Sequence, residues 1–219
     1  MIEARTQPSR MAASDRRQQL VETALDVFSR KGFEGATTKE IAAAAGVTEA
    51  VIFRHFPSKQ ALYKAVLDYT VQASGHEGWL AEIKACMDRN DDAGLLRALA
   101  ASILRSYRQD PRFERLVLFA ALEGHEMGLA HHHQVAMPVY DLLRDYIVRR
   151  QREGALRGHH PGVIIEAIAG MTQHYAMMTQ LFGYSAPDGL SDEKAIETFT
   201  EIVMNGIQPA ANPTKKNHK

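Results

Sequence analysis

The sequence predicts an all-α fold, with a small N-terminal three-helix domain followed by a larger helical domain. Apolar residues recur every three or four positions between residues 14 and 206, and no stretch shows the alternation of a β-strand. With 219 residues, 45% of them hydrophobic, the chain is long enough to bury a sizeable core. Glycine, proline and aspartate residues separate the periodic stretches, so the helices can be placed in order.

A first helix is predicted over residues 14–31, because its apolar side chains fall on one face. Gly32 follows as a residue typical of helix ends. The apolar face consists of Leu20, Val21, Ala24, Leu25, Val27 and Phe28.

Two short helices joined by a turn are predicted next. Thr37 and Glu40 match a Thr-x-x-Glu capping box, in which each side chain accepts a hydrogen bond from the other residue's amide. Gly46 supplies the turn, and Thr48 caps a second short helix that ends near Arg54. Their order predicts a helix-turn-helix, whose second helix fits the DNA major groove. The side chains expected to face inward are Ile41, Ala42, Ala45, Val47, Ile52 and Phe56.

The rest of the chain is predicted to form further helices, the first of which is capped by Ser58 after Pro57. They are expected at residues 59–74, 79–90, 93–108, 111–127, 134–153, 163–183 and 191–206. The predicted domains are residues 14–74 and 75–206, followed by a polar tail at 207–219 that is expected to be disordered.

The net charge is zero, but the charges are unevenly distributed. Residues 1–70 carry 10 basic and 8 acidic side chains, residues 71–206 carry 13 and 18, and residues 207–219 carry 3 and none. No acidic residue lies between Glu49 and Asp68. The basic side chains in this acid-free stretch are Arg54, His55, Lys59 and Lys64. A local positive patch therefore coincides with the second short helix, as expected of a nucleic-acid-binding surface.

Residues 37–59, with the sequence TTKEIAAAAGVTEAVIFRHFPSK, resemble the DNA-binding segment of the TetR family of bacterial transcriptional regulators. The shared pattern is a Thr before a short helix, Ile-Ala, Ala-Gly-Val-Thr, an aromatic residue, His-Phe and Ser-Lys. The resemblance by motif covers residues 14–74, and beyond it only length and helical content agree. It implies a homodimeric repressor that binds a palindromic double-stranded DNA operator and leaves it when a small-molecule inducer enters the larger domain.

The resemblance also implies which residues contact DNA. Those expected at phosphates or the sugar-phosphate backbone are Thr38, Lys39, Phe53, His55 and Lys59, with Arg54 either joining them or facing solvent. Those expected at the groove are Thr48, Glu49, Ala50 and Val51.

Three of these residues depart from the family pattern. Phe53 replaces a Tyr, which removes a hydrogen bond worth about 1 kcal/mol. Ala50 replaces a Gly and prevents the closest backbone approach. Glu49 either accepts a hydrogen bond from a cytosine amino group or only favours the positive end of its helix. A helical ligand-binding or interaction protein with weakened or lost DNA binding is therefore the alternative function.

The histidines are candidate metal ligands, but their spacing does not match a known metal-binding motif. His125 and His131 are six positions apart, which does not match the His-Glu-x-x-His spacing of a zinc helix. The run from His131 to His133 is expected in a solvated loop after Gly128. The sequence also lacks a Gly-x-Ser-x-Gly elbow, a P-loop and a Gly-x-Gly-x-x-Gly motif. No catalytic residue, metal ligand or cofactor is assigned, and an enzyme is not expected.

The larger domain contains bulky, adaptable side chains that can line an apolar pocket, although any helical core contains such residues. The candidates are Trp79, Met87, Phe119, Leu122, Met137, Tyr140, Met171, His174, Tyr175 and Met178, with Phe182 beside them. His174 and Tyr175 stand out because their polar ends could orient a ligand. The helices at 134–153 and 163–183 are the expected dimer elements.

A cytoplasmic protein without a membrane partner is expected. Cys86 is the single cysteine and cannot form an intrachain disulfide, which fits a reducing compartment. No apolar stretch approaches the roughly 20 residues that cross a bilayer, and the first ten residues lack a secretory apolar segment.

Overall fold

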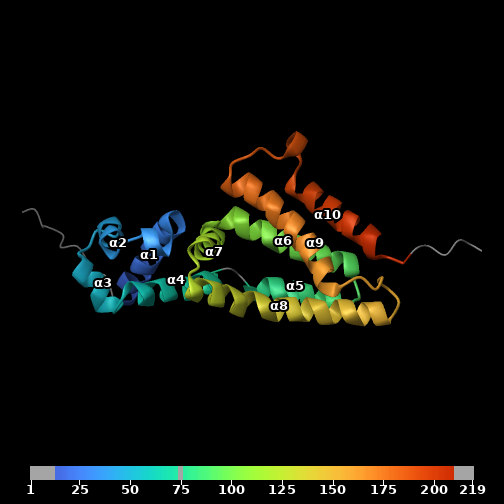
Figure 1. Ribbon diagram of the computed structural model, residues 1–219, viewed down its shortest axis with the longest axis horizontal. Coiled ribbons are helices and arrows are strands. Elements are labelled where there is room, and N and C mark those ends of the chain that lie inside the picture. Colours follow the sequence, from blue (N-terminus) through green and yellow to red (C-terminus); the bar gives the residue numbers. More distant parts are fainter. Residues whose placement is uncertain (1–12, 74–75, 210–219) are drawn as a thin grey trace, which may run out of the picture. The chain divides into compact units, whose positions relative to one another are not determined.

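The computed structural model describes residues 13–73 and 76–209 (Figure 1). The helices are α1 (Ala13–Gly35), α2 (Thr38–Ala44), α3 (Glu49–His55), α4 (Lys59–Ala73), α5 (His76–Asp88), α6 (Asp92–Gln109), α7 (Arg112–Glu123), α8 (Glu126–Arg152), α9 (Pro161–Ala176) and α10 (Asp192–Ile207). A π-helical turn, η1 (Met177–Leu181), and a 3-10 turn, η2 (Pro187–Gly189), lie between α9 and α10. No β-strand occurs in these residues, so the predicted all-α class is confirmed. No helix in this part of the chain is long and apolar enough to cross a bilayer.

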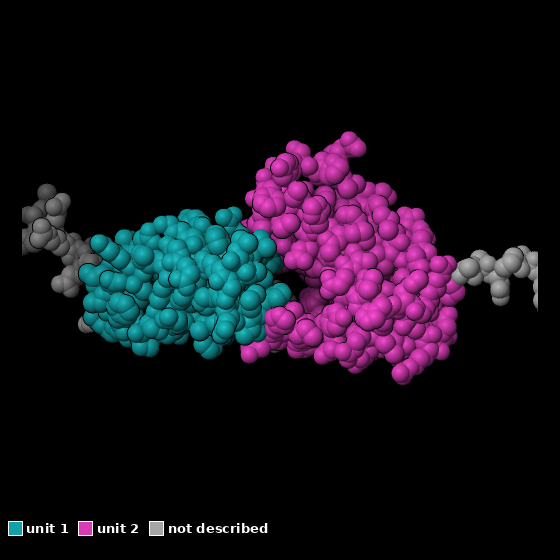
Figure 2. All heavy atoms as spheres, viewed as in Figure 1, with its two compact units in different colours: residues 1–73, 112–132 teal, residues 74–111, 133–219 magenta. Residues whose placement is uncertain are grey.

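The described residues form two compact units (Figure 2). Unit 1 comprises α1 to α4 together with residues 112–132, which are α7 and the start of α8. Unit 2 comprises α5, α6, the rest of α8, α9 and α10. Residues 1–12 and 210–219 lie outside the described residues, and with them most of the tail predicted at 207–219. The first residue of that predicted tail, Ile207, is instead the last residue of α10 and is buried.

Unit 1 is built on the apolar face predicted for the first helix. Leu20, Ala24 and Phe28 are fully buried, and α2, α3 and α4 pack around them. The predicted inward side chains of α2 and α3 are confirmed, because Ile41, Ala42, Ala45, Ile52 and Phe56 are all buried and Val47 packs against them half-buried.

Helix α7 packs on α1 and completes this core. Leu116 is buried in the same apolar cluster as the α1 residues, and the Arg115 Nε atom donates to the Ser29 carbonyl at 2.8 Å. The boundary predicted at residues 74 and 75 assigned residues 112–132 to the larger domain. The structure differs, because the apolar face of α7 finds its burial against α1.

The start of α8 differs from the loop predicted after Gly128. The helix begins at Glu126, so His131, His132 and His133 lie on a helix and not in a loop. The break falls at Gly124, which adopts a positive φ of 64°, whereas Gly128 is buried inside α8. A Cβ at Gly128 would lie 2.6 Å from the Ala120 Cβ, so a residue without a side chain is needed there for close packing. Within the described residues, no group of three or more histidine, cysteine, aspartate or glutamate side chains could hold a metal ion.

Unit 2 is centred on α6, which contacts α5, α9 and α10. The helix has a strongly apolar face in which Leu95, Leu96, Leu99 and Leu104 are buried. Cys86 is also buried in this unit, in the core where α5, α6, α8, α9 and α10 meet. The predicted helix at 163–183 corresponds to α9 continued directly by the π-helical turn η1, which ends at Leu181.

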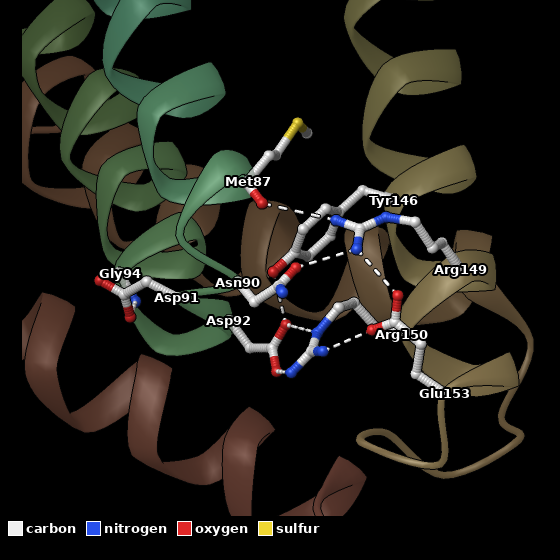
Figure 3. A network of polar contacts seen from close by, with 9 residues as sticks. All are labelled: Met87, Asn90, Asp91, Asp92, Gly94, Tyr146, Arg149, Arg150 and Glu153. Carbon is white, nitrogen blue, oxygen red and sulfur yellow. Dashed lines mark hydrogen bonds and ion pairs between the residues drawn. The ribbon is translucent and has the colours of Figure 1, made fainter.

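A polar network joins the start of α6 to the end of α8 within unit 2 (Figure 3). The Asp92 carboxylate accepts a hydrogen bond from the Tyr146 hydroxyl at 2.6 Å and from two Arg150 nitrogens at 2.9 Å each. Arg150 also donates to Glu153 at 2.6 Å. Burial, together with the hydrogen bond to Asp92, raises the pKa of Tyr146 above its ordinary value. The network holds two helix ends together with charged groups that are largely removed from water.

Candidate nucleic-acid interface

The first short helix is fixed by the capping box that its sequence predicts. The Glu40 amide donates to the Thr37 hydroxyl at 3.2 Å, and the Thr37 amide donates to the Glu40 carboxylate at 3.1 Å. Lys31 adds an ion pair to Glu40 at 2.6 Å. The hydrogen bond from Lys31, followed by the bond from the Thr37 amide, lowers the pKa of Glu40. The start of α2 is therefore tied both to its own cap and to α1.

The turn between α2 and α3 depends on glycine. Gly46 has a φ of 68°, a conformation that side-chain-bearing residues rarely adopt. Its amide donates to the Ala43 carbonyl at 3.1 Å, and the Val47 amide donates to the Ala42 carbonyl at 3.0 Å. These bonds satisfy the last carbonyls of α2 and redirect the chain into α3.

Helix α3 presents an outward face with few contacts to the rest of unit 1. Ile52 is fully buried beneath it, and Phe56 closes its C-terminus. The outward side chains Thr48, Glu49, Ala50, Phe53 and Arg54 are exposed, whereas Val51 and His55 are half-buried. Phe53 leaves 47% of its surface in solvent, although a large apolar side chain is normally buried. The side chains predicted to face outward on α3 are thus exposed or half-buried, while Ile52 is fully buried beneath them.

Two residues expected at different DNA sites contact each other. The Thr38 hydroxyl, at the start of α2, donates a hydrogen bond to the Oε1 atom of Glu49, at the start of α3. Glu49 is exposed and Thr38 is half-buried. The two residues are eleven positions apart on different helices, so no local sequence pattern predicts their contact.

The basic side chains near α3 differ in whether they have an interaction partner. Lys39 and Arg54 are exposed and have no ion-pair partner among the residues that the structure describes. The Lys59 ammonium lies 4.3 Å from the centre of the Phe33 ring, a cation–π contact that orients it at the start of α4. Lys64 pairs with Asp68 at 2.9 Å, one turn away on the same helix. The charge of Lys64 is therefore compensated, and the acid-free stretch of sequence overstates the positive patch.

Glu123, which was not singled out in the sequence, caps the chain at Gly32. Its carboxylate accepts hydrogen bonds from the amides of Phe33 at 3.0 Å and Glu34 at 3.3 Å. Gly32 interrupts the regular geometry of α1 there, with φ 74° and ψ 179°. The glycine gives a visible sign of a chain break, but its partner lies about ninety residues away and no local pattern identifies it.

An aromatic cluster supports the same region from behind. The Tyr63 ring lies 5.1 Å from Phe28, 5.0 Å from Phe33 and 4.9 Å from His125, between ring centres. Burial and the negative charge of Glu123 raise the pKa of Tyr63 to about 12. The cluster joins α1, α4 and the chain before α8 into one support for Lys59 and the short helices.

In unit 2, some of the predicted ligand-contacting residues come together. Met171, His174, Tyr175 and Met178 line an open cavity of about 420 Å³ at the surface of unit 2, formed by α9, η1, the following loop and α10. The other lining residues are Thr179, Tyr184, Ser185, Pro187 and Phe199. The Tyr175 hydroxyl donates to the Asp192 carboxylate at 3.3 Å, and Arg108 holds that carboxylate at 2.7 Å.

The remaining predicted ligand contacts lie elsewhere. Met87 is buried in the main core of unit 2, and Trp79 and Tyr140 pack against that core. Met137 is 43% exposed on α8. Phe119 and Leu122 belong to α7 in unit 1, where Phe119 packs against Gly32 and Leu122 is 85% exposed. Apolar composition alone did not separate cavity-lining residues from core and surface residues.

Comparison with known proteins finds a matching family model and several relatives. A family model described as bacterial regulatory proteins, tetR family, matches residues 20–66. The HTH-type transcriptional regulator RutR of Escherichia coli (strain K12) is 28% identical to this chain over 202 residues, which cover 90% of this chain and 93% of RutR. The match to RutR therefore extends through both units.

Solved structures share the fold. AibR, crystallised in complex with isovaleryl coenzyme A and operator DNA, superimposes with a TM-score of 0.62 at 22% identity, covering 85% of this chain and 97% of AibR. A transcriptional regulator from Saccharomonospora viridis in complex with choline gives a TM-score of 0.67 at 18% identity, covering 90% and 99%. At these identities the likeness shows a common fold.

Proposed function

We propose that this chain is a DNA-binding transcriptional repressor of the TetR family of bacterial regulatory proteins. Unit 1 binds a palindromic operator. The repressor dissociates from the operator when unit 2 binds a small-molecule inducer. The observation that carries the proposal is the capped α2, the glycine turn and α3, whose outward residues are exposed while its inward residues are buried. A regulatory role without a catalytic step, in the cytoplasm, follows from the same proposal.

The proposal assigns the phosphate contacts to basic side chains that have no acidic partner. Lys39 lies on the first turn of α2, Arg54 lies on α3, and Lys59 lies at the start of α4. Cations at these positions neutralise phosphates and displace condensed counterions, which makes affinity fall as the salt concentration rises. Groove contacts then come from Thr48, Glu49, Ala50 and Val51, and backbone contacts from Phe53 and His55.

Lys39→Ala is expected to weaken binding to operator and to unrelated DNA by a similar factor, about 10-fold. Because a dimer loses two phosphate contacts, the slope of log affinity against log salt should become shallower by about 2. Lys59→Met, which keeps most of the stem over Phe33, should act in the same way. Fluorescence anisotropy at several salt concentrations measures both quantities.

Lys64→Ala is the matched control, because its charge is already compensated by Asp68. It should leave the affinity and the salt slope nearly unchanged. Equal effects of Lys39→Ala and Lys64→Ala would show that the assigned phosphate contacts are wrong.

The function itself is tested by selecting sequences from a random duplex library with the full chain. A repressor of this kind should enrich a palindrome whose half-sites are spaced by whole turns of DNA. The chain's own upstream DNA should then contain a match and give a footprint. Failure to enrich any sequence would favour the alternative, a helical ligand-binding or interaction protein without DNA binding.

We propose that α9 and α10 form the dimer face. Val163 on α9 is 63% exposed and Ile202 on α10 is 55% exposed, which is unusual for such apolar side chains. A Cβ at Gly170 or Gly206 would meet no atom within 4 Å, so a second helix can approach closely there. Helix α8, the other element considered from the sequence, has its apolar residues Leu143, Tyr146 and Ile147 buried inside unit 2. A twofold dimer also provides the two recognition helices that a palindrome requires.

For the inducer we propose the cavity lined by Met171, His174, Tyr175 and Met178. An apolar wall with a few polar ends suits an amphipathic organic molecule. AibR is described with isovaleryl coenzyme A and the Saccharomonospora viridis regulator with choline, so regulators of this fold are known with small organic ligands bound. A ligand releases DNA only if it binds the DNA-free state more tightly than the DNA-bound state.

Met178→Trp is expected to weaken binding of the amphipathic dye 1-anilinonaphthalene-8-sulfonate by about 10-fold or more, because the larger side chain fills the cavity. Dye fluorescence titration measures this, and size-exclusion chromatography checks the oligomeric state. Met137→Trp makes the same change on an exposed position of α8 and should leave dye binding unchanged. Unchanged binding in Met178→Trp would contradict the assignment of this cavity.

A further inference from the structure

The hydrogen bond between Thr38 and Glu49 joins the first residues of α2 and α3. The two residues are eleven positions apart and meet across the glycine turn. Thr38 uses its only hydroxyl proton in this bond, so in this arrangement it has no proton to donate to a phosphate. The Glu49 carboxylate keeps its second oxygen, Oε2, which has no partner among the residues that the structure describes.

This free oxygen lies where base contacts are expected. In helix-turn-helix proteins, side chains at the start of the second helix reach base edges in the major groove. Glu49 is the first residue of α3, and its side chain is exposed. A carboxylate among phosphates is repelled unless it accepts a hydrogen bond from the DNA, and only base amino groups offer such donors in the major groove.

Cytosine fits a carboxylate better than adenine does. The N4 amino group of cytosine is a donor with no acceptor beside it on the same base, whereas the N6 amino group of adenine lies next to the acceptor N7. A carboxylate only accepts hydrogen bonds, so it would face the adenine N7 unfavourably. The bond from Thr38 also limits the rotation of the Glu49 side chain before binding, which reduces the entropy lost on contact.

We propose that Glu49 reads one cytosine in each operator half-site by accepting a hydrogen bond from its N4 amino group, and that Thr38 positions the carboxylate. The proposal rests on the DNA-binding function proposed above. It gives Glu49 a role beyond that of an acidic residue near the positive end of a helix, which would stabilise α3 whatever the DNA sequence.

The test is selection from a random duplex library by the full-length chain and three variants. Glu49→Gln keeps the size of the side chain and adds a donor, so the enriched half-site should change at one position from cytosine towards adenine, the base that glutamine contacts through N6 and N7. Thr38→Val keeps the shape of Thr38 without its hydroxyl, and discrimination at the same position should fall about 5-fold. Lys39→Ala is the control, which should weaken binding without changing the enriched sequence.

Anisotropy with the enriched duplex and its substituted versions then gives the size of the effect. For the unmodified chain, replacing that cytosine should cost about 10-fold or more in affinity. In Glu49→Gln the penalty for that replacement should disappear, while penalties at the other positions stay. Circular dichroism confirms that each variant is folded.

Each other outcome overturns part of the proposal. An unchanged half-site in Glu49→Gln would leave Glu49 with the helix-stabilising role alone. A preference at that position for a base other than cytosine would overturn the assigned partner. Unchanged discrimination in Thr38→Val would remove Thr38 as a positioning residue. Failure of the unmodified chain to enrich any sequence would instead overturn the proposed function, which distinguishes the two failures.

Discussion

Asp92→Ala is expected to destabilise unit 2 by about 3 kcal/mol. The side chains of Asp92 and Arg150 are each only 15% exposed, and the substitution leaves the guanidinium without its main partner. The Tyr146 hydroxyl also loses its acceptor. The loss of stability should appear as a lower midpoint temperature for the unfolding of unit 2. Differential scanning calorimetry measures this temperature and can resolve two units that unfold separately.

Asp141→Ala is the matched control for this prediction. Asp141 pairs with Arg144 at 2.7 Å on the exposed side of α8, where both side chains are largely solvated. Surface pairs of this kind contribute between zero and about 1 kcal/mol. Similar midpoints for Asp92→Ala and Asp141→Ala would mean that the network does not hold the ends of α6 and α8 together.

Gly32→Ala is expected to destabilise unit 1 by about 3 kcal/mol and to weaken DNA binding. The φ of 74° with ψ near 180° is a conformation almost restricted to glycine. A Cβ there would overlap the Glu123 carboxylate and lie 2.9 Å from the Phe119 ring. Displacing Glu123 removes the cap from the amides of Phe33 and Glu34. Calorimetry and anisotropy with the enriched duplex measure the two effects.

Gly124→Ala is the control that separates the backbone strain in Gly32→Ala from the clash with Glu123. Gly124 also has a positive φ, 64°, but a Cβ there would meet no atom within 4 Å. Its expected cost is about 1 kcal/mol, the strain of the left-handed conformation alone. If Gly32→Ala cost no more than Gly124→Ala, Glu123 would have no essential role in shaping the chain before α2.

Features encoded within a few neighbouring residues could be predicted from sequence. The capping box of Thr37 and Glu40, the turn at Gly46 and the cap at Ser58 all appear where expected, because each partner lies within four residues. The buried face of α1 follows from the helical period in the same way. The family resemblance added the expectation that the outward residues of α3 contact DNA.

Predictions about which helices pack together were less successful. Helix α7 was assigned to the larger domain, yet Leu116 is buried in unit 1. Helix periodicity indicates that a face is apolar but does not indicate which partner covers it. The predicted ligand residues that lie on α9 and η1 line one cavity, because they are close in sequence on one helical segment. The predicted ligand residues on other helices do not line it, because their positions depend on how those helices pack.

The amino-acid sequence by itself thus determined α1 to α4, the caps at Thr37 and Ser58 and the outward face of α3, since these depend on dihedral preferences, local hydrogen bonds and the helical period. Only the tertiary structure decided that Glu123 caps the chain at Gly32, that Asp92 meets Arg150, and that Thr38 holds Glu49. Those contacts join different helices, and whether two side chains meet depends on how every intervening element packs.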